Sequence, residues 1–274
     1  MKIQTIWAVY FSPASHTRDV VRWMARKAAE ELGDIQVKEY DWTLPEARKQ
    51  KIVFGEQDFV FLGTPTYAGR VPNKLMPFIR DFIDGNGACG AAVVTYGNRS
   101  YDDALIELYD LMERNRFHMT GAAAFVCEHA FAGSLASGHP DKKDRREAEA
   151  FAVKALHSVG GEKLRRLIPG NRPLGPYYVP KGEDGNPVRF LTAKPKTKEE
   201  LCDDCGICAK VCPMGSISPE DVRTVAGICI KCQACIQKCP NGAKYFDDEA
   251  FLSHKRMLEQ HFGKGKKKNE SYVL

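Results

Sequence analysis

Apolar and polar positions follow two different spacings along the first 160 residues of the chain. Short runs that are apolar or alternate every second residue are typical of strands, and longer segments with apolar residues every three or four positions are typical of helices. Strands that alternate with helices predict a parallel sheet covered on both faces. The strand-like runs are residues 6–11, 35–40, 59–63, 91–96 and 122–127, and the helix-like segments are residues 18–32, 74–83, 102–114 and 142–156.

Five strands of this kind predict an α/β domain, residues 1–160, with a doubly wound parallel sheet. Ligands of such sheets bind in a crevice at the carboxyl ends of the strands. Residues 161–198 contain six prolines and nine Lys or Arg, which predicts an extended basic linker draped over one or both domains. Residues 199–248 form a cysteine-rich domain that is expected to be small and α+β.

The last part of the chain, residues 249–274, combines an amphipathic segment with a basic end. The apolar spacing of residues 251–262 predicts a short helix. Residues 264–274 are rich in lysine, and we expect them to be a mobile, solvated tail.

Ten cysteines are present, and eight of them lie between residues 202 and 239. Because the N-terminus lacks the features of a signal peptide, such clustering indicates metal ligation and not disulfides. Each cysteine of a first run has a counterpart 27 residues later, and both runs have the spacing C-x₂-C-x₂-C-x₃-C-P of bacterial ferredoxins with two 4Fe–4S clusters. The runs are Cys202, Cys205, Cys208 and Cys212, and Cys229, Cys232, Cys235 and Cys239.

The spacing also predicts which cysteines share a cluster. Three closely spaced cysteines surround three corners of one cube, whereas the fourth, just before a proline, is turned away and ligates the other cluster. Zinc ribbons would leave four cysteines unexplained, and a disulfide scaffold needs an oxidising compartment. We therefore assign Cys202, Cys205, Cys208 and Cys239 to cluster one, and Cys229, Cys232, Cys235 and Cys212 to cluster two.

A hydroxyl-rich segment, residues 12–17, follows the first strand and opens the first helix. Backbone N–H groups and hydroxyls at a helix N-terminus suit a phosphate, since the helix dipole favours an anion there. An ordinary N-cap by Ser15 or Thr17 is the alternative. Loops 63–70 and 95–102 follow the third and fourth strands, and their aromatic, glycine and polar residues suit a flat heterocycle held between them.

These features resemble the flavodoxin fold with its FMN site, and the whole chain resembles the flavodoxin–ferredoxin fusion proteins of anaerobes. The matching stretches are residues 64–72, residues 95–104 and the double cysteine run. The resemblance implies that FMN is a cofactor. The implied phosphate contacts are Ser12, Ala14, Ser15, His16 and Thr17, and the implied isoalloxazine contacts are Thr66, Tyr67, Ala68 and Gly69 on one side and Tyr96, Gly97, Asn98, Arg99 and Tyr101 on the other.

Other features have simpler explanations. The family usually has a glycine in the phosphate loop where this chain has Ser15, which lacks the freedom of glycine at positive φ.

Residues 85–90 fit G-x-G-x-x-G but follow a helix and precede a strand, so they predict a turn and not a dinucleotide site. Cys89 and Cys127 are expected to be small buried residues, and His129 a loop histidine on the crevice side.

The net charge of +5 changes when cofactors are counted. Two clusters and one flavin phosphate each add about −2, which brings the total to about −1 and gives no support for a nucleic-acid partner. No apolar run is long enough to span a membrane, and the expected location is the cytoplasm.

The combination of cofactors predicts an electron-transfer protein. It would pass single electrons between two 4Fe–4S clusters and FMN, and so link one-electron with two-electron redox partner proteins in an anaerobic type of metabolism. One alternative is an FMN-dependent reductase of a small acceptor, such as a quinone, enoyl or nitro compound, that is fed by the clusters. A second alternative is a binding or sensing module stabilised by its clusters. The sequence indicates no catalytic residue.

Overall fold

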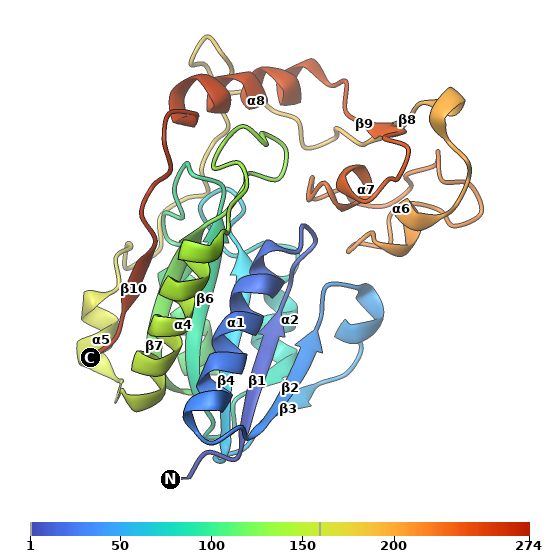
Figure 1. The fold of residues 1–274 in the computed structure, drawn as a ribbon. Coiled ribbons are helices and arrows are strands. Elements are labelled where there is room, and N and C mark those ends of the chain that lie inside the picture. Colours follow the sequence, from blue (N-terminus) through green and yellow to red (C-terminus); the bar gives the residue numbers. More distant parts are fainter. Residues whose placement is uncertain (1, 159) are drawn as a thin grey trace.

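The computed structural model describes residues 2–158 and 160–274. Its main sheet has the strand order β10-β7-β6-β4-β1-β2 (Figure 1). The strands are β1 (Thr5–Tyr10), β2 (Gln36–Asp41), β4 (Asp58–Pro65), β6 (Cys89–Tyr96), β7 (His118–Val126) and β10 (Glu270–Tyr272). The first five are parallel to one another. Numbered in chain order they lie 2-1-3-4-5, the flavodoxin-like arrangement, so the predicted doubly wound sheet is confirmed.

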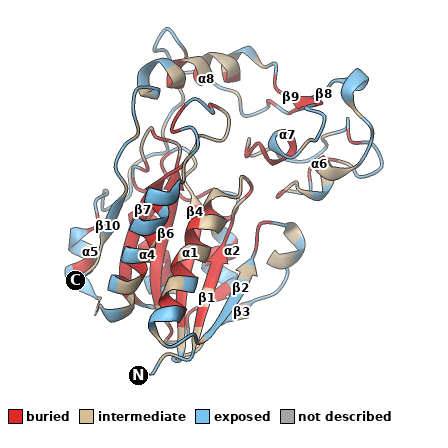
Figure 2. Ribbon diagram, viewed as in Figure 1, coloured by how far each residue is buried: buried red, intermediate tan, exposed pale blue. Residues whose placement is uncertain are grey.

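Helices cover both faces of this sheet, and each face has its own core. The alternation of side chains along β1 sends Ile6 and Ala8 into one core and Val9 into the other. The central strands are therefore almost wholly buried, as Figure 2 shows. All four predicted helices are present within two residues of their expected ends. They are α1 (His16–Glu31) and α4 (Lys142–His157) on one face, and α2 (Met76–Phe82) and α3 (Ala104–Arg114) on the other.

The prediction of a mobile C-terminal tail is wrong. Strand β10 pairs antiparallel with β7, with Glu270 opposite Ala124, and so adds a sixth strand to the sheet. Just before it, Lys266 Nζ lies 2.6 Å from a carboxylate oxygen of the buried Asp144. This contact joins residues 122 positions apart, and the local sequence of the tail does not reveal it.

Residues 161–198 are mostly extended, but they begin with the short helix α5 (Glu162–Leu167). Leu164 of this helix is buried in the same core as α3. Further along, the Asp103 carboxylate accepts hydrogen bonds from the backbone N–H groups of Asn171 (2.9 Å) and Gly175 (2.7 Å). The proline-rich segment is therefore fixed to the surface of the α/β domain.

Smaller elements lie at the edges of the α/β domain. They are the 3₁₀ helix η1 (Pro45–Arg48) and the two-stranded ladder of β3 (Ile52–Val53) and β5 (Ile83–Asp84). Residues 85–88 connect β5 with β6, and Cys89 and Gly90 begin β6, so the expected turn is confirmed for residues 85–88.

The cysteine-rich region repeats its conformation as well as its sequence. Gly206 and Gln233, 27 residues apart, precede two short helices in the left-handed conformation, with φ of 71° and 65°. Gly215 and Gly242 likewise have φ of 58° and 61°. The elements are β8 (Lys196–Thr197), η2 (Glu199–Leu201), α6 (Ile207–Lys210), α7 (Ala234–Gln237) and β9 (Lys244–Tyr245), followed by α8 (Glu249–Phe262).

This region lies beyond the carboxyl ends of the parallel strands, with α7 facing the α/β domain (Figure 1). Strands β8 and β9 pair with each other, antiparallel. Among the helices of the described residues, none has the length and the apolar character needed to cross a membrane.

Candidate functional site

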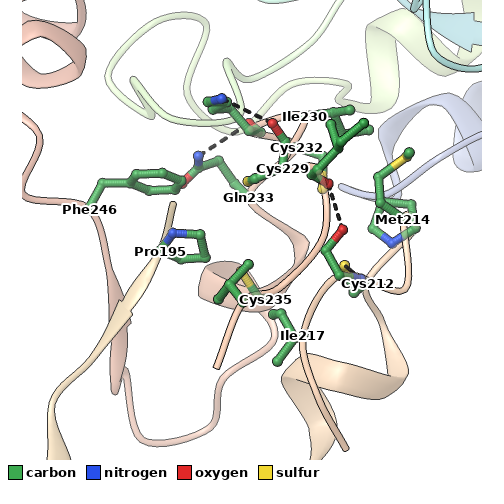
Figure 3. A pocket seen from close by; sticks show the side chains of 15 residues that line it. Pro195, Cys212, Met214, Ile217, Cys229, Ile230, Cys232, Gln233, Cys235 and Phe246 are labelled. Carbon is green, nitrogen blue, oxygen red and sulfur yellow. Dashed lines mark hydrogen bonds between the residues drawn. The ribbon is translucent and has the colours of Figure 1, made fainter. Parts of the chain in front are cut away.

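The eight clustered cysteines converge in two groups, and each group lines its own cavity. The lining of the first cavity, which we call cavity one, includes the first three cysteines of run one and the last of run two. The lining of cavity two includes the last cysteine of run one and the first three of run two (Figure 3). No cysteine of the described residues forms a disulfide. The cysteines of cavity one are Cys202, Cys205, Cys208 and Cys239, and those of cavity two are Cys212, Cys229, Cys232 and Cys235.

Cys212 and Cys239, which each line the cavity of the other run, have equivalent backbone N–H groups beside their sulfurs. The N–H of Ser216 lies 3.3 Å from Cys212 Sγ, and the N–H of Ala243 lies 3.2 Å from Cys239 Sγ. Such donors favour a thiolate over a thiol. Although partial burial opposes it, the N–H bonds from Ala243 and its neighbours lower the pKa of Cys239. The same local fold therefore places a backbone N–H group beside the sulfur of each fourth cysteine.

Cavity one lies near solvent and has charged neighbours. Cys205 is exposed, and Oδ1 of Asp204 lies 3.6 Å from Cys202 Sγ. The same carboxylate receives a 2.7 Å hydrogen bond from Arg223. Lys244, one of the residues that line this cavity, is buried and donates to the hydroxyl of Thr197 at 2.7 Å.

Cavity two has the more apolar lining, and two of its cysteines, Cys232 and Cys235, are buried. Ile217 and Phe246 in its wall are buried, and burial raises the pKa of Cys235 to about 12. Met214 and Ile230, also in the wall, pack against the core of the α/β domain (Figure 3). Cavity two is therefore the one that adjoins the α/β domain, whereas cavity one includes the exposed Cys205.

Two hydrogen bonds join the helix α7 region to loops of the α/β domain. Gln237 Nε2 donates to the carbonyl of Ala130 at 3.0 Å, and Lys238 Nζ lies 3.4 Å from Ser15 Oγ. Neither contact has a signature in the sequence, because Gln237 and Lys238 belong neither to the cysteine pattern nor to a predicted loop motif.

The predicted phosphate loop has free donors at the start of α1. Ser15 has φ of 70°, a left-handed conformation that glycine adopts more readily than serine. In the described chain, the N–H groups of Ala14, His16 and Thr17 have no protein acceptor. The hydroxyl of Ser12 accepts a 3.0 Å hydrogen bond from Arg18 N, which leaves its O–H free to donate. This donor set fits a phosphate group.

The first predicted isoalloxazine loop is a tight hairpin turn. Tyr67 and Arg70 exchange backbone hydrogen bonds of 2.9 and 3.1 Å, and Ala68 and Gly69 between them have φ of 50° and 76°. Positive φ at both central residues is the type I′ pattern. Just before the turn, Thr66 Oγ1 is buried without a hydrogen-bond partner, so a polar group of a ligand has a place to bind.

One end of the hairpin turn contacts helix α3, and the other end lies near cavity two. Arg70 forms a two-pronged ion pair with the buried Glu107, with distances of 2.8 and 2.6 Å. Tyr67 stands at the other end of the turn. Burial raises the pKa of Tyr67 well above its usual value, and the thiols of Cys232 and Cys229 in cavity two add to the effect. Tyr67 therefore belongs both to the predicted flavin loop and to the surroundings of cavity two.

The second predicted isoalloxazine loop is covered by the C-terminal tail. Asn98 is buried and its amide makes three 2.8 Å hydrogen bonds to the tail: it donates to the carbonyls of Phe262 and Gly265 and accepts from Lys267 N. Tyr101 Oη donates to Glu270 at 2.7 Å. These two side chains are thus engaged within the protein, which the sequence did not indicate.

The other residues of this loop also have protein contacts. Tyr96 Oη lies 3.5 Å from the carbonyl of Lys268, and the Arg99 guanidinium lies 3.8 Å from the ring centre of Tyr178. A Cβ on Gly97 would lie 2.3 Å from Cδ2 of His129, so the glycine allows this histidine to approach closely. Burial lowers the pKa of His129 to about 3, which keeps its ring neutral.

Comparison with known proteins agrees with the cysteine geometry. Residues 201–244 match the family model described as the 4Fe-4S dicluster domain. No relative was found among curated proteins. A flavodoxin from the domain Archaea is 15% identical with a TM-score of 0.38, and the alignment covers 56% of this chain and 96% of that one. The Streptococcus pneumonia TIGR4 flavodoxin is 19% identical with a TM-score of 0.38, covering 55% and 97%.

A third solved structure with similarity is the rubredoxin oxygen:oxidoreductase of the anaerobe Desulfovibrio gigas. It is 15% identical with a TM-score of 0.35, and the alignment covers 61% of this chain and 38% of that one. These structural similarities are weak, and the strand order alone defines the α/β domain as flavodoxin-like.

The match at residues 201–244 and the converging cysteines define an iron–sulfur protein of the 4Fe–4S class. Within that class, the chain has the organisation of a flavodoxin–ferredoxin fusion, with a flavodoxin-like domain followed by a 4Fe–4S dicluster domain.

Proposed function

We propose that this protein is an electron-transfer protein that passes single electrons between two 4Fe–4S clusters and a bound FMN. Iron–sulfur clusters exchange one electron at a time and a flavin exchanges one or two, so one chain with both can link one-electron and two-electron redox partners. The observation that carries this proposal is the pair of four-cysteine cavities, one of which adjoins the α/β domain.

The eight cysteines are the proposed ligands, four to each cluster. The exchange of Cys212 and Cys239 between the runs would tie the two halves of the domain together. Backbone N–H groups at Ser216 and Ala243 would stabilise the ligating sulfurs. In cavity two, the buried side chains of Ile217 and Phe246 would exclude water from the cluster.

The N-terminal domain offers the proposed FMN site. The free N–H groups of Ala14, His16 and Thr17 would bind the phosphate at the start of α1. The unpartnered Thr66 hydroxyl and the adjoining Tyr67 turn would contact the isoalloxazine. Because the side chains of Asn98 and Tyr101 are engaged by the tail, the second loop would contribute its backbone and Gly97.

The different surroundings of the two cavities suggest separate roles. Cavity one, with the exposed Cys205, is accessible to an external redox protein. Cavity two adjoins Tyr67 of the predicted flavin loop. Eight free thiols also require a reducing compartment, for which the cytoplasm is the proposed location.

Anaerobic purification followed by cofactor analysis tests the proposal. We expect about eight irons and eight sulfides per chain, as two 4Fe–4S clusters require, and one FMN released on denaturation. In stopped-flow spectroscopy, reduction of the clusters should be followed by matching reduction of the flavin. Clusters that stay reduced beside an oxidised flavin would contradict internal transfer. Flavin reoxidation that depends on an added quinone, enoyl or nitro compound would favour the reductase alternative.

A further inference from the structure

A cation of the flavodoxin-like domain reaches the loop that carries Cys212. Arg48 is the last residue of η1. Its Nη1 donates to the carbonyls of Trp42 at 2.9 Å and Thr43 at 2.6 Å, and its Nη2 donates to the carbonyl of Pro213. Pro213 follows Cys212, and both residues line cavity two. The guanidinium therefore lies at the wall of this cavity, although it comes from the other domain.

The contact between η1 and this loop is extended. Met214 packs against the core of the α/β domain, and a Cβ on Gly215 would lie 3.6 Å from Cγ of Pro45, at the start of η1. Together with the hydrogen bonds of Arg48, these contacts fix the position of its charge relative to the Cys212 loop.

The charge of Arg48 is not cancelled by a neighbour. All three of its hydrogen-bond acceptors are carbonyl oxygens, and no carboxylate of the described residues forms an ion pair with it. Arg223, one of the cations near cavity one, differs, since it lies 2.7 Å from the Asp204 carboxylate. Lys49, next to Arg48, is exposed and pairs with Glu46 at 2.7 Å. Arg48 therefore contributes a net positive charge at cavity two.

We propose that Arg48 sets the reduction potential of cluster two, and so makes this potential depend on the docking of the flavodoxin-like domain. Reduction adds one negative charge to a cluster, and a nearby positive charge stabilises the reduced form. Arg48 is half-buried, so solvent and salt screen it less than an exposed cation. The inference rests on the proposed function, because it requires a cluster in cavity two.

The test is an anaerobic redox titration of the full-length protein with its cofactors, followed by electron paramagnetic resonance. We expect Arg48→Gln to shift the reduction equilibrium of one cluster about tenfold toward the oxidised form, which equals about 59 mV for one electron. The other cluster should keep its potential. Arg48→Lys, which keeps the charge, should restore most of the wild-type value. Lys49→Gln is the matched control and should leave both potentials unchanged.

Three results would overturn the inference: unchanged cluster potentials in Arg48→Gln, an equal shift in Lys49→Gln, or a shift in Arg48→Lys as large as that in Arg48→Gln. The last result would show that Arg48 acts only through its hydrogen bonds. If Arg48→Gln loses iron, Arg48→Met, which is also uncharged and unbranched, takes its place in the comparison with Arg48→Lys. Failure of the proposed function is separate, since it would appear in the wild-type protein as fewer than two clusters or as a flavin that is not reduced.

Discussion

Nζ of Lys266 lies 2.6 Å from Oδ1 of Asp144, a carboxylate whose side chain is 1% exposed. Asp144 is also part of the capping box of α4, where it accepts from the N–H of Asp141 at 2.9 Å. The amide of Asn269 donates to it at 2.7 Å, and Nδ1 of His139 lies 2.6 Å from its other oxygen. The basic tail therefore supplies two donors to a buried charge, and the tail in turn covers the loop of Asn98.

Replacement of Asp144 should release the tail. We expect Asp144→Asn to destabilise the α/β domain by about 2–4 kcal/mol, because it breaks a buried ion pair and a helix cap together. The backbone amides of β10 should then exchange hydrogen faster. Urea unfolding and hydrogen exchange measure the two effects. Glu147→Gln, which changes an exposed partner of Asn269 and of Lys143, is the control and should cost less than about 1 kcal/mol.

The same carboxylate predicts how stability depends on pH. Burial opposes ionisation, but the hydrogen bonds from Lys266, Asp141 N, His139 and Asn269 outweigh it and hold the pKa of Asp144 well below its usual value. A lowered folded-state pKa stabilises the protein above the unfolded value of about 3.9, and this stability is lost as the pH falls below it.

Unfolding in urea between pH 3 and pH 6 checks this expectation. All three tryptophans lie within the first 42 residues, so their fluorescence reports the α/β domain alone. Asp144→Asn should show a flatter pH dependence than the wild type. Parallel curves for the two proteins would mean that other groups control acid stability.

The sequence predicts those parts of this protein that repeat or alternate. The parallel strands follow from apolar periodicity, and the pairing of Cys212 and Cys239 with the opposite cavities follows from a spacing that the structure repeats in its backbone. Contacts made by single side chains across long sequence separations have no such signature. Lys266 looks like one lysine of a solvated run, and Arg48 looks like one cation of a charged loop. Their roles become visible only when the fold brings Asp144 and Pro213 beside them.

Exchanged ligation predicts which double variants lose one cluster and which lose two. Cys205→Ala with Cys239→Ala removes two ligands from the same proposed cluster, so about four irons should remain in cluster two. Cys235→Ala with Cys239→Ala removes one ligand from each cluster, so both should be lost or degraded. Iron analysis and electron paramagnetic resonance of anaerobic protein distinguish the two patterns. If Cys235→Ala with Cys239→Ala instead spares one whole cluster, then each run ligates its own cluster and the exchange is wrong.

The conformation of Ser15 predicts a stabilising substitution in the proposed phosphate loop. Ser15 has φ of 70°, where a residue with a Cβ costs roughly 1 kcal/mol more than glycine. Ser15→Gly should therefore stabilise the α/β domain by about 0.5–1 kcal/mol, even though glycine makes the unfolded chain more flexible. Ala14→Gly is the matched control: Ala14 is not among the residues with positive φ, so the same kind of change should destabilise the domain.

The FMN affinity of Ser15→Gly shows whether backbone N–H groups or the Ser15 side chain bind the phosphate in the proposed loop. Ser15→Gly keeps the free N–H groups of Ala14, His16 and Thr17, and it loses only a 3.4 Å contact between the hydroxyl and Lys238. If the backbone donors hold the phosphate, FMN should bind to Ser15→Gly within about threefold of the wild-type affinity, a difference below about 1 kcal/mol. Titration of the apoprotein, followed by flavin fluorescence, measures it. A loss of tenfold or more would instead assign the main phosphate contact to the Ser15 hydroxyl.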